Sequence, residues 1–456
     1  MKIGILGGAG VRTVIFIHGL IRRSEKLGID EVVLYDINRD KQEIIGKLCR
    51  YVAQRDHGKF QVRWVARAEE AIRGMDAIVT TLRVGGDHGR VMDEDLALKR
   101  GVIGQETTGV GGFSMAVRTI PVLLDYMERI QREAPEAWVF NFTNPSGLVT
   151  QALHERGYHR VIGICDAPSS MKYRMAQALK VPEEELYTEF FGLNHLSWIR
   201  SVRLRGREIM PELIGDDGFL REIQELSVFD PRVIRRTGLL PNEYLYYYYH
   251  REKALENMKA TSSLRGRTIE RVNREMFREL EGMDLEAEPE EALQAFLWGM
   301  QLRENSYMTV ESGGQTRPLK ARGTLPVPEG MGYAGVMLDC IEGMQSREGK
   351  SLVLSVLNGD SLPFLDRGDV VEMTCHVSQQ GIEPVKVSQV PDFCRSYILR
   401  IKEFEKLTVE AVMRGSRDLA WQALALHPLV NSWSLADALL GDLEACYGTG
   451  LPWTTK

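Results

Sequence analysis

Two features are missing from the sequence, and each absence excludes a class of protein. The 456-residue chain has no stretch of about 18 apolar residues, so we expect no membrane-spanning helix. Positive charge is not in excess either, because 57 Lys and Arg face 63 Asp and Glu, giving a formal net charge of −6. Without a basic field the protein has no general means of holding nucleic acid by its phosphates. We therefore expect neither a membrane nor a nucleic-acid partner, and any anion recognition must be local.

Closely spaced cysteines are also absent. The chain has six, and they are scattered: Cys49, Cys165, Cys340, Cys375, Cys394 and Cys446. In a chain of this length such spacing does not indicate a disulfide framework. The first residues, MKIGILGGAG, begin a strand-like segment and lack the charged and apolar regions of a signal peptide. We therefore expect a cytoplasmic protein.

Short apolar segments rich in β-branched residues alternate with helical patterns through the first half of the chain. Strands are expected at Lys2–Gly7, Glu31–Tyr35, Ala77–Thr81, Trp138–Phe142 and Val161–Ile164. Each is a continuous apolar run, which is typical of a parallel sheet buried on both faces. The alternation predicts an α/β fold that begins with a Rossmann-like, doubly wound parallel sheet.

The pattern changes after about residue 170. Long helical segments, among them Tyr244–Asn257 and Phe393–Leu424, and a strand pair indicate an α+β second half. A stretch rich in Gly, Pro, Ser and Thr at 306–330 is expected to be a long loop. The length suggests two or three domains. We predict two domains, at residues 1–168 and at residues 169–456.

A glycine-rich turn follows the first expected strand and opens the first helix. It reads GGAGVRT from Gly7 to Thr13. Glycine lets the backbone approach a pyrophosphate closely, and a helix N-terminus offers free N–H groups. Thr13 stands where the full dinucleotide fingerprint has a third glycine, and the alternative is a tight turn without a ligand. The expected nucleotide contacts are Gly7, Gly8, Gly10, Val11 and Arg12.

An acidic residue closes the second expected strand. Asp36 lies 26 residues after Gly10, where a carboxylate accepts hydrogen bonds from the ribose hydroxyls of NAD and repels a 2′-phosphate. We therefore favour NAD over NADP. Arg39 stands close by and is included among the expected cofactor contacts, because an arginine there could accommodate the extra phosphate of NADP.

Cysteine and histidine occur at two places that bear on metal binding. Cys165 and Asp166 follow the fifth expected strand directly, and His195 lies in the segment FGLNHLSW. A thiolate and an imidazole together suit a transition metal, although buried cysteines and histidines are more often plain core residues. The adjacent pair Cys375 and His376 falls on a strand pattern, which sends successive side chains to opposite faces. We interpret that second pair as structural.

Three further polar residues follow expected strands or their turns. Arg90 lies in RVGGDHGR, Glu106 in the glycine-dense segment GQETTGVGGF, and Asn144 in NFTNP. Each could be ordinary loop chemistry. Ligands of open α/β sheets bind at the carboxyl ends of the strands, so their shared position makes them candidate site residues.

Four motifs, in this order, make the chain similar to glycoside hydrolase family 4. They are QETTGVGGF, FNFTNPSG, GLNHLSW and PNEYLYYY. Within the family, the pattern most resembles the 6-phospho-β-glucosidases. The resemblance implies NAD and a divalent metal, typically Mn²⁺, as cofactors. It also implies that residues 1–168 form the NAD-binding domain. Residues 169–456 would form a domain of the lactate/malate dehydrogenase C-terminal type for substrate, metal and oligomerisation, and the protein would be a homodimer or homotetramer.

The resemblance also implies roles for residues around the metal. Cys165 and His195 match the metal ligands. Tyr244, in PNEY, matches the base that removes the proton from C2 of the sugar, and Glu106 matches an acid that supports this base. Asp166 stands where the α-acting members have a catalytic acid, whereas many 6-phospho-β-glucosidases have Asn there.

Three more residues match positions that hold the substrate and its 6-phosphate: Arg90, Asn144 and Arg265. Asn144 is expected to contact the cofactor as well. The implied reaction oxidises C3 with NAD⁺, eliminates the aglycone across C1 and C2, adds water and returns the hydride to C3. In this respect family 4 is an exception to the paired-carboxylate mechanism of most glycosidases.

The expected function is hydrolysis of 6-phospho-β-glucosides such as cellobiose 6-phosphate. Three alternatives stay open on the sequence. One is a family 4 enzyme for an α-linked or unphosphorylated glycoside, since Arg90 could also pair with a uronate carboxylate. The others are an NAD-dependent hydroxy-acid dehydrogenase and a non-catalytic NAD-binding regulator.

Overall fold

We describe the fold from a computed structural model, which covers residues 1–314, 316, 318–328 and 332–454. A nine-stranded sheet forms the centre of the molecule, in the order β13-β12-β11-β6-β5-β4-β1-β2-β3. Its first six strands are β1 (Lys2–Leu6), β2 (Glu31–Tyr35), β3 (Gln61–Trp64), β4 (Ala77–Thr80), β5 (Trp138–Asn141) and β6 (Val161–Gly163). These six pair in parallel. Their order, 3-2-1-4-5-6, is that of the doubly wound nucleotide-binding fold, and the predicted fold class is confirmed.

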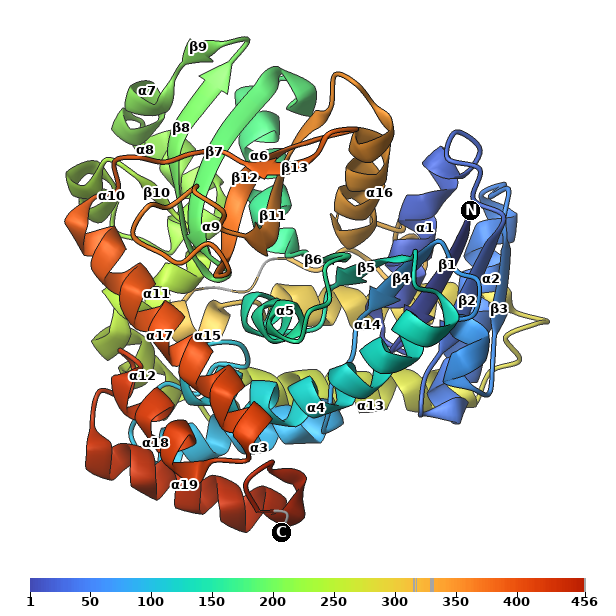
Figure 1. Ribbon diagram of the computed structural model, residues 1–456. Helices are drawn as coiled ribbons and strands as arrows, with labels where there is room; N and C mark the ends of the chain where they lie inside the picture. Colours follow the sequence, from blue (N-terminus) through green and yellow to red (C-terminus); the bar gives the residue numbers. More distant parts are fainter. Residues whose placement is uncertain (315, 317, 329–331, 455–456) are drawn as a thin grey trace.

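Both faces of the parallel sheet are buried, which explains the continuous apolar runs. Ile3 and Val79 pack into one core with residues of α1 (Arg12–Ser24) and α2 (Arg39–Arg55). Ile78 and Val139 pack into a second core with residues of α4 (Gly109–Glu133) and α5 (Ser146–Glu155). Figure 1 shows α1 and α2 on one side of the strands and α4 and α5 on the other. Consecutive strand residues point to opposite faces, so every position of a central strand such as β4 has to be apolar or small.

The second half of the chain extends this sheet and adds a smaller one. Strands β11 (Lys350–Leu357), β12 (Val370–Ser378) and β13 (Gly381–Pro384) continue the large sheet antiparallel beyond β6. The smaller sheet contains β7 (Leu186–Leu193), β8 (Leu196–Leu204), β9 (Arg207–Glu208) and β10 (Leu240–Pro241). The predicted division at residue 168 stays a prediction, because one sheet takes strands from both sides of it.

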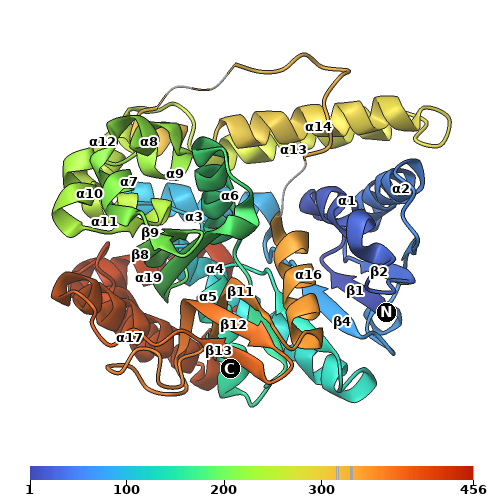
Figure 2. The same ribbon diagram turned by 90° about the horizontal axis from the view of Figure 1, so that it is seen from above.

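Helices of the second half lie around these sheets. They are α6 (Asp166–Leu179), α7 (Met210–Gly215), α8 (Asp217–Glu222), α9 (Gln224–Ser227), α10 (Pro231–Thr237), α11 (Tyr246–Tyr249), α12 (Arg251–Ala260), α13 (Arg265–Glu281), α14 (Pro289–Asn305), α15 (Thr309–Ser312), α16 (Gly332–Gln345), α17 (Asp392–Arg414), α18 (Arg417–Leu426) and α19 (Trp433–Tyr447). Figure 2 shows α13 and α14 side by side along one edge of the molecule. The expected loop at 306–330 contains the short α15, and its residues 315, 317, 329 and 330 lie outside the described residues.

Within residues 1–168, one strand and one α-helix were not expected from the sequence, and in the second half the helices α7–α10 and α16 were not expected either. Strand β3 is at the edge of the sheet, where Gln61 is exposed and Arg63 pairs with Glu31, so its sequence is not a continuous apolar run. Helix α3 (Gly86–Lys99) buries the charged residues Arg90 and Glu94. An apolar periodicity cannot reveal a helix whose buried face is charged.

Two long helices expected from the sequence are interrupted. The segment expected as one helix from Tyr244 to Asn257 consists of a 3₁₀ turn at Glu243–Leu245, then α11 and α12. The segment expected at Phe393–Leu424 is divided between α17 and α18, where Gly415 has a φ of 58°. The first interruption matters for the site, because it leaves Tyr244 outside a regular α-helix.

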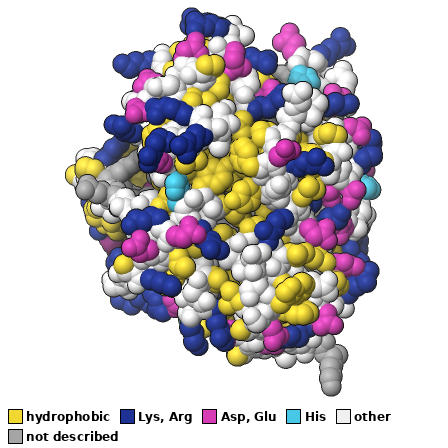
Figure 3. All heavy atoms as spheres, turned by 90° about the vertical axis from the view of Figure 1, so that its left-hand side faces the viewer, with side chains coloured by type: hydrophobic (Ala, Val, Ile, Leu, Met, Phe, Trp, Pro, Cys, Tyr) yellow, Lys and Arg dark blue, Asp and Glu magenta, His cyan; other side chains and the backbone are white. Residues whose placement is uncertain are grey.

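One face of the molecule is rich in apolar side chains. Figure 3 views the side on which α10 and the first part of α17 lie in Figure 1, and apolar side chains gather near the centre of this face. Large exposed apolar patches are typical of contact surfaces. A homodimer or homotetramer stays a prediction.

We predict that Gly7→Ala destabilises the protein more than Gly28→Ala. Both glycines have a positive φ, 94° and 58°, so alanine costs about 1–2 kcal/mol at either position. A Cβ on Gly7 would also lie 2.4 Å from the carbonyl oxygen of Thr81, whereas a Cβ on Gly28 meets nothing within 4 Å. Thermal unfolding of the two variants measures the difference, and equal melting temperatures would contradict the close packing of this turn.

Candidate functional site

One large cavity, of about 1390 Å³, opens at the carboxyl ends of the parallel strands. The segments after β1, β2, β4, β5 and β6 all contribute to its wall. Thirteen of the residues singled out in the sequence line it: Gly7, Gly10, Val11, Arg12, Asp36, Arg90, Glu106, Asn144, Cys165, Asp166, His195, Tyr244 and Arg265. Gly8 and Arg39 are not among the lining residues. The fold therefore brings nearly all of the candidate residues to one place.

The glycine turn forms the wall of the cavity next to β1. The backbone N–H groups of Gly7 and Gly8 both donate to the carbonyl oxygen of Tyr35, at 2.9 Å each. A Cβ on Gly8 would lie 2.8 Å from the Cβ of Leu34, so this glycine allows β1 and β2 to pack closely. Helix α1 begins at Arg12, and its N-terminus faces the cavity as an anion site requires.

Asp36 and Arg39 differ in where their side chains lie. The Asp36 carboxylate accepts a hydrogen bond from the backbone N–H of Ala9 at 3.1 Å and lines the cavity beside the glycine turn. Arg39 donates instead to the carbonyl oxygens of Val65 and Ala66, at the end of β3. The acid is therefore in place for a ribose, while the arginine is turned toward the backbone.

Cys165 and His195 meet although they come from different sheets. Cys165 caps α6 after β6, and His195 lies in the two-residue turn between β7 and β8, with a φ of 61°. The Cys165 Sγ and His195 Nε2 atoms are 3.6 Å apart, and both side chains are buried. Ligand bonds of about 2.3 Å from sulfur and 2.1 Å from nitrogen span this distance at an angle near 110°. The two side chains thus fit a shared transition-metal ion.

A buried glutamate fixes the turn that carries His195. Glu372, on β12, accepts hydrogen bonds from Asn194 Nδ2 at 2.8 Å and from Ser197 Oγ at 3.0 Å. Burial raises the pKa of the Glu372 carboxyl to about 7, although both hydrogen bonds lower it. The residues on either side of His195 are therefore held by the large sheet.

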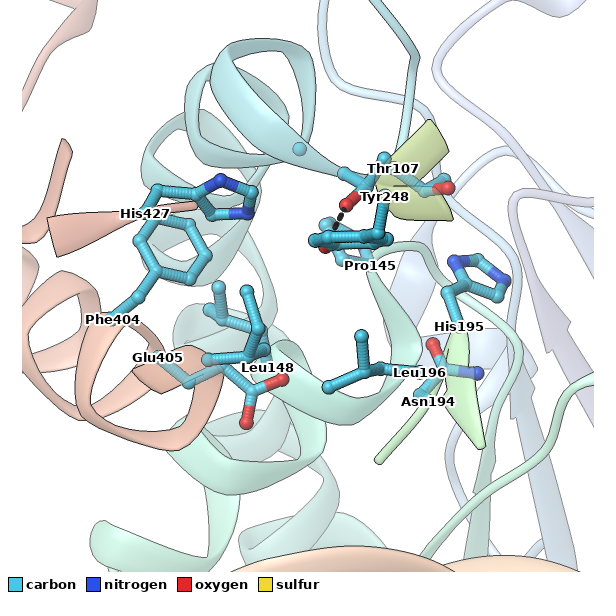
Figure 4. A pocket seen from close by; sticks show the side chains of 13 residues that line it. Thr107, Pro145, Leu148, Asn194, His195, Leu196, Tyr248, Phe404, Glu405 and His427 are labelled. Atoms are coloured by element: carbon cyan, nitrogen blue, oxygen red, sulfur yellow. Dashed lines mark hydrogen bonds between the residues drawn. The ribbon is translucent and has the colours of Figure 1, made fainter. Parts of the chain in front are cut away.

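His195 also borders a second, much smaller cavity of about 20 Å³. Figure 4 shows one ring nitrogen of His195 directed toward this space, beside Tyr248, and the other directed away from it. Since Nε2 faces Cys165, the nitrogen at the small cavity is Nδ1, and it has no hydrogen-bond partner within the described part of the chain. A volume of this size admits one water molecule, a common partner for the second nitrogen of metal-binding histidines.

Among the described residues, no group of three or more His, Cys, Asp and Glu side chains is arranged to hold a metal ion. A metal site formed by Cys165 and His195 would therefore have only two protein ligands from these residue types and would be open. A catalytic ion with few protein ligands keeps positions for substrate oxygens.

Tyr244 lies directly on His195. The two rings are stacked, with centroids 3.8 Å apart and planes inclined by 17°. Burial raises the pKa of the Tyr244 hydroxyl well above its ordinary value, and the neighbouring Glu243 and Cys165 raise it further. The Tyr244 phenol therefore requires added positive charge before it can act as a base.

Glu106 is surrounded by arginines. Its Oε2 atom is 2.8 Å from Arg83 Nη1 and 2.9 Å from Arg90 Nη1. Burial raises the pKa of the Glu106 carboxyl, but Arg90, Arg83 and Arg265 outweigh burial and hold this pKa far below its ordinary value. Glu106 is therefore ionised at neutral pH, and its carboxylate is engaged by arginines.

Asp166 forms an ion pair that links the glycine turn to the segment after β6, which contains Cys165. Its Oδ2 atom is 2.8 Å from Arg12 Nη1. Arg12, expected as a phosphate contact, therefore also bonds the residue that follows Cys165.

Among the cavity residues that were not singled out in the sequence, three lie beside Glu106 or Tyr244: Arg83, Glu243 and Tyr307. The Tyr307 hydroxyl donates to Glu243 Oε1 at 3.0 Å, and hydrogen bonding from Tyr307 lowers the pKa of Tyr244. Glu243 is buried, and desolvation raises its carboxyl pKa to about 8. Arg83 and Glu243 lie within motifs already noted, so they could have been found there, whereas Tyr307 belongs to the expected loop and carried no signal.

The second Cys–His pair has the predicted structural character. Cys375 and His376 lie on β12, with the cysteine buried and the histidine exposed. Helices long and apolar enough to cross a membrane do not occur in the described ranges.

Comparison with known proteins identifies the family to which the sequence is similar. A model of the family 4 glycosyl hydrolases matches residues 2–181, and a model of the family 4 glycosyl hydrolase C-terminal domain matches residues 190–430. The chain is 29% identical over 436 residues to a 6-phospho-beta-glucosidase of Thermotoga maritima, covering 94% of each chain. It is 27% identical over 463 residues to a 6-phospho-alpha-glucosidase of Leptotrichia buccalis, covering 97% of this chain and 96% of that one.

A solved structure is similar over the whole chain. The Thermotoga maritima 6-phospho-beta-glucosidase, crystallised with manganese, NAD⁺ and glucose 6-phosphate, aligns with a TM-score of 0.83 and 27% identity over 99% of both chains.

We predict that Glu106→Gln lowers the melting temperature at pH 6 and makes the melting temperature decrease less steeply as the pH falls. Breaking a largely buried ion pair costs roughly 3 kcal/mol. The folded-state pKa of Glu106 lies far below the ordinary value of 4.5, so its ion pairs stabilise the protein above pH 4.5 and this contribution is lost as the pH falls below it. Melting temperatures between pH 6 and pH 3 measure both effects.

The matched control is Glu275→Gln, which removes an exposed carboxylate paired with Arg271. We expect this control to change the melting temperature little, because exposed ion pairs contribute about 0–1 kcal/mol. An acid profile of Glu106→Gln as steep as that of the wild type would contradict the assigned charge of Glu106.

Proposed function

The chain belongs to family 4 of the glycosyl hydrolases, and on this basis we propose that it hydrolyses 6-phospho-β-glucosides, such as cellobiose 6-phosphate, with NAD⁺ and a divalent ion as cofactors. The observation that carries the proposal is the convergence of Cys165, His195 and Tyr244 with the glycine turn on one cavity. Cys165 and His195 would hold the ion, typically Mn²⁺. Residues 1–168 would bind the cofactor, and residues 169–456 would supply most of the substrate contacts.

Arg265 supports a phosphorylated substrate. Its guanidinium lines the cavity and donates to Ser306 Oγ at 2.8 Å, a neutral partner. No carboxylate lies within 4.0 Å of it in the parts of the chain that the structure describes. A largely buried cation favours an anionic ligand over a neutral one, and a sugar 6-phosphate supplies forked, charge-assisted bonds. Arg90, by contrast, is already paired with Glu94 and Glu106.

The β-specificity rests on two considerations. The matched relatives include 6-phospho-beta-glucosidases and a 6-phospho-alpha-glucosidase at similar identity, so similarity alone does not separate the anomers. Asp166, which corresponds to the acid of α-acting members, is engaged in an ion pair with Arg12. We infer that a carboxylate held in this way does not protonate the aglycone and that water does so instead. An α-linked substrate is the second candidate, favoured by the presence of Asp at position 166.

The reaction divides between bound groups and side chains of this protein. Residues 1–168 would hold NAD⁺, which would supply a hydride acceptor and donor for the sugar C3, and Cys165 and His195 would hold a divalent ion, which would supply Lewis-acid polarisation and positive charge beside Tyr244. Tyr244, stacked on His195, is placed to take the proton from C2, and a cation held at His195 would oppose the burial that raises the tyrosine pKa. Glu106 keeps Arg83 and Arg90 in place at the substrate.

Hydrolysis of p-nitrophenyl β-glucoside 6-phosphate tests the proposed function. We expect turnover only with both NAD⁺ and Mn²⁺, loss of turnover on chelation of the metal, and no accumulation of NADH, because the hydride returns in each cycle. The α-anomer and the unphosphorylated β-glucoside serve as matched substrates and should react at least about tenfold more slowly. Preference for the α-anomer would establish the second candidate, and stoichiometric NADH would indicate a dehydrogenase.

We predict that Tyr244→Phe abolishes exchange of the C2 proton with deuterated solvent and lowers kcat by roughly 10²–10⁴-fold. The phenyl ring keeps the stack on His195 but cannot accept a proton. The matched control is Tyr246→Phe, because Tyr246 is buried on α11 and does not line the cavity. NMR of the product formed in D₂O measures the exchange. Exchange at the wild-type rate in Tyr244→Phe would assign the base to another residue.

A further inference from the structure

Arg303 lies in the cavity wall, and the sequence analysis assigned no role to it. It belongs to the last turn of α14 and lines the large cavity. Its backbone carbonyl oxygen accepts a hydrogen bond from Arg265 Nη1 at 3.3 Å. The two arginines are therefore neighbours, although 38 residues separate them in the chain.

The direction of the Arg303 side chain is fixed by two bonds. Arg303 Nη1 donates to Asn273 Oδ1 at 2.5 Å, and Asn273 Nδ2 donates to Asp87 Oδ2 at 2.6 Å. The amide of Asn273 thus presents its oxygen to the arginine because its nitrogen is held by the aspartate. A guanidinium has five N–H donors in a planar fork, and this contact uses one of them.

The charge of Arg303 is not matched by a direct partner. Three other arginines at the cavity are paired with carboxylates: Arg12 with Asp166, Arg83 with Glu106, and Arg90 with Glu94 and Glu106. Arg265, like Arg303, has neutral hydrogen-bond partners. Over the described ranges, Arg303 has no carboxylate within 4.0 Å, and Asp87 reaches it only through Asn273. An uncompensated cation in a cavity wall is costly unless a ligand brings the counter-charge.

The electrostatic surroundings agree with this geometry. Burial lowers the pKa of Arg303 to about 9, with Arg12, Arg83 and Arg265 lowering it further against the opposite effect of Asp87. Positive charge therefore accumulates between the glycine turn, where Arg12 begins α1, and Arg265 at the start of α13. An anion bound there would be attracted by several guanidinium groups at once.

We propose that Arg303 binds a phosphate group of a cavity ligand through its unused N–H donors, with Asn273 and Asp87 positioning its fork. The inference rests on the proposed function, which supplies two ligands with this chemistry: the pyrophosphate of the dinucleotide and the 6-phosphate of the sugar. Both offer oxygens for forked bonds from one guanidinium. A neutral sugar or ribose alone would leave the charge of Arg303 unmatched.

Calorimetric binding to the intact protein, without turnover, tests the proposal and distinguishes the two phosphates. The ligands are NAD⁺, glucose 6-phosphate in the presence of NAD⁺, and glucose as the unphosphorylated reference. Arg303→Gln retains a side-chain amide that can donate to Asn273 but removes the charge. We expect this variant to bind either NAD⁺ or glucose 6-phosphate about 10- to 100-fold more weakly, which is the effect of losing one charged hydrogen bond. Its affinity for glucose should not change.

Two further variants complete the design. Arg303→Lys keeps the charge but lacks the planar, forked guanidinium. We therefore expect it to reduce the affinity for the same ligand by a smaller factor, about threefold to tenfold. Arg271→Gln removes an arginine of α13 that is exposed and paired with Glu275, and it should bind both ligands as the wild type does. Weaker NAD⁺ binding assigns the cofactor pyrophosphate, and weaker glucose 6-phosphate binding assigns the sugar phosphate.

Unchanged affinity for both ligands in Arg303→Gln would overturn the proposal. Should that variant fail to fold, Arg303→Lys decides, and wild-type affinity of that variant for both ligands would likewise overturn the assignment. Wild-type protein that binds these ligands but does not hydrolyse the phosphoglucoside would contradict the proposed function while leaving the role of Arg303 intact. The two failures are therefore distinguishable.

Discussion

The hydrogen bonds of one buried carboxylate, Glu372, fix the position of His195 in the site. It joins β12 of the large sheet to the β7–β8 turn by bonds to Asn194 and Ser197. His195 lies between these two residues, so its imidazole is fixed relative to β6, where Cys165 follows. The distance between the Cys165 sulfur and the His195 nitrogen thus depends on a contact between two sheets, and a metal site built from only two side chains requires such rigidity.

Charge compensation organises the rest of the cavity. Parallel strands all end on one edge, so the segments that follow them meet there, and many of these segments carry arginine or a carboxylate. Most of these arginines form an ion pair with a carboxylate, as Arg83 does with Glu106. Each of these ion pairs holds an arginine and a carboxylate in a fixed position in the cavity wall. An arginine with neutral partners, such as Arg265, remains available to a ligand.

The sequence was sufficient for the elements that have a simple apolar pattern. The five central parallel strands are buried on both faces, so their runs could be recognised. His195 could be matched through a long motif, and Cys165 was noted because it directly follows a strand. The edge strand β3 and the charged helix α3 could not be recognised, because neither carries the apolar periodicity on which such predictions depend. Tyr307 escaped for a different reason. Its proximity to Glu243 and Tyr244 is created by tertiary packing, and no spacing in the sequence encodes it.

The continuity of the large sheet has a consequence for the order of folding. Strand β6 pairs with β5 on one side and with β11 on the other, and β11 is synthesised long after β6. Until then the nascent chain exposes the backbone of β6 as an open edge, together with apolar side chains such as that of Ile162, which the finished molecule buries. Unpaired edges of this kind promote aggregation. A fragment that ends before β11 would keep that edge permanently, so the two halves of this enzyme depend on each other for solubility as well as for the close approach of Cys165 and His195.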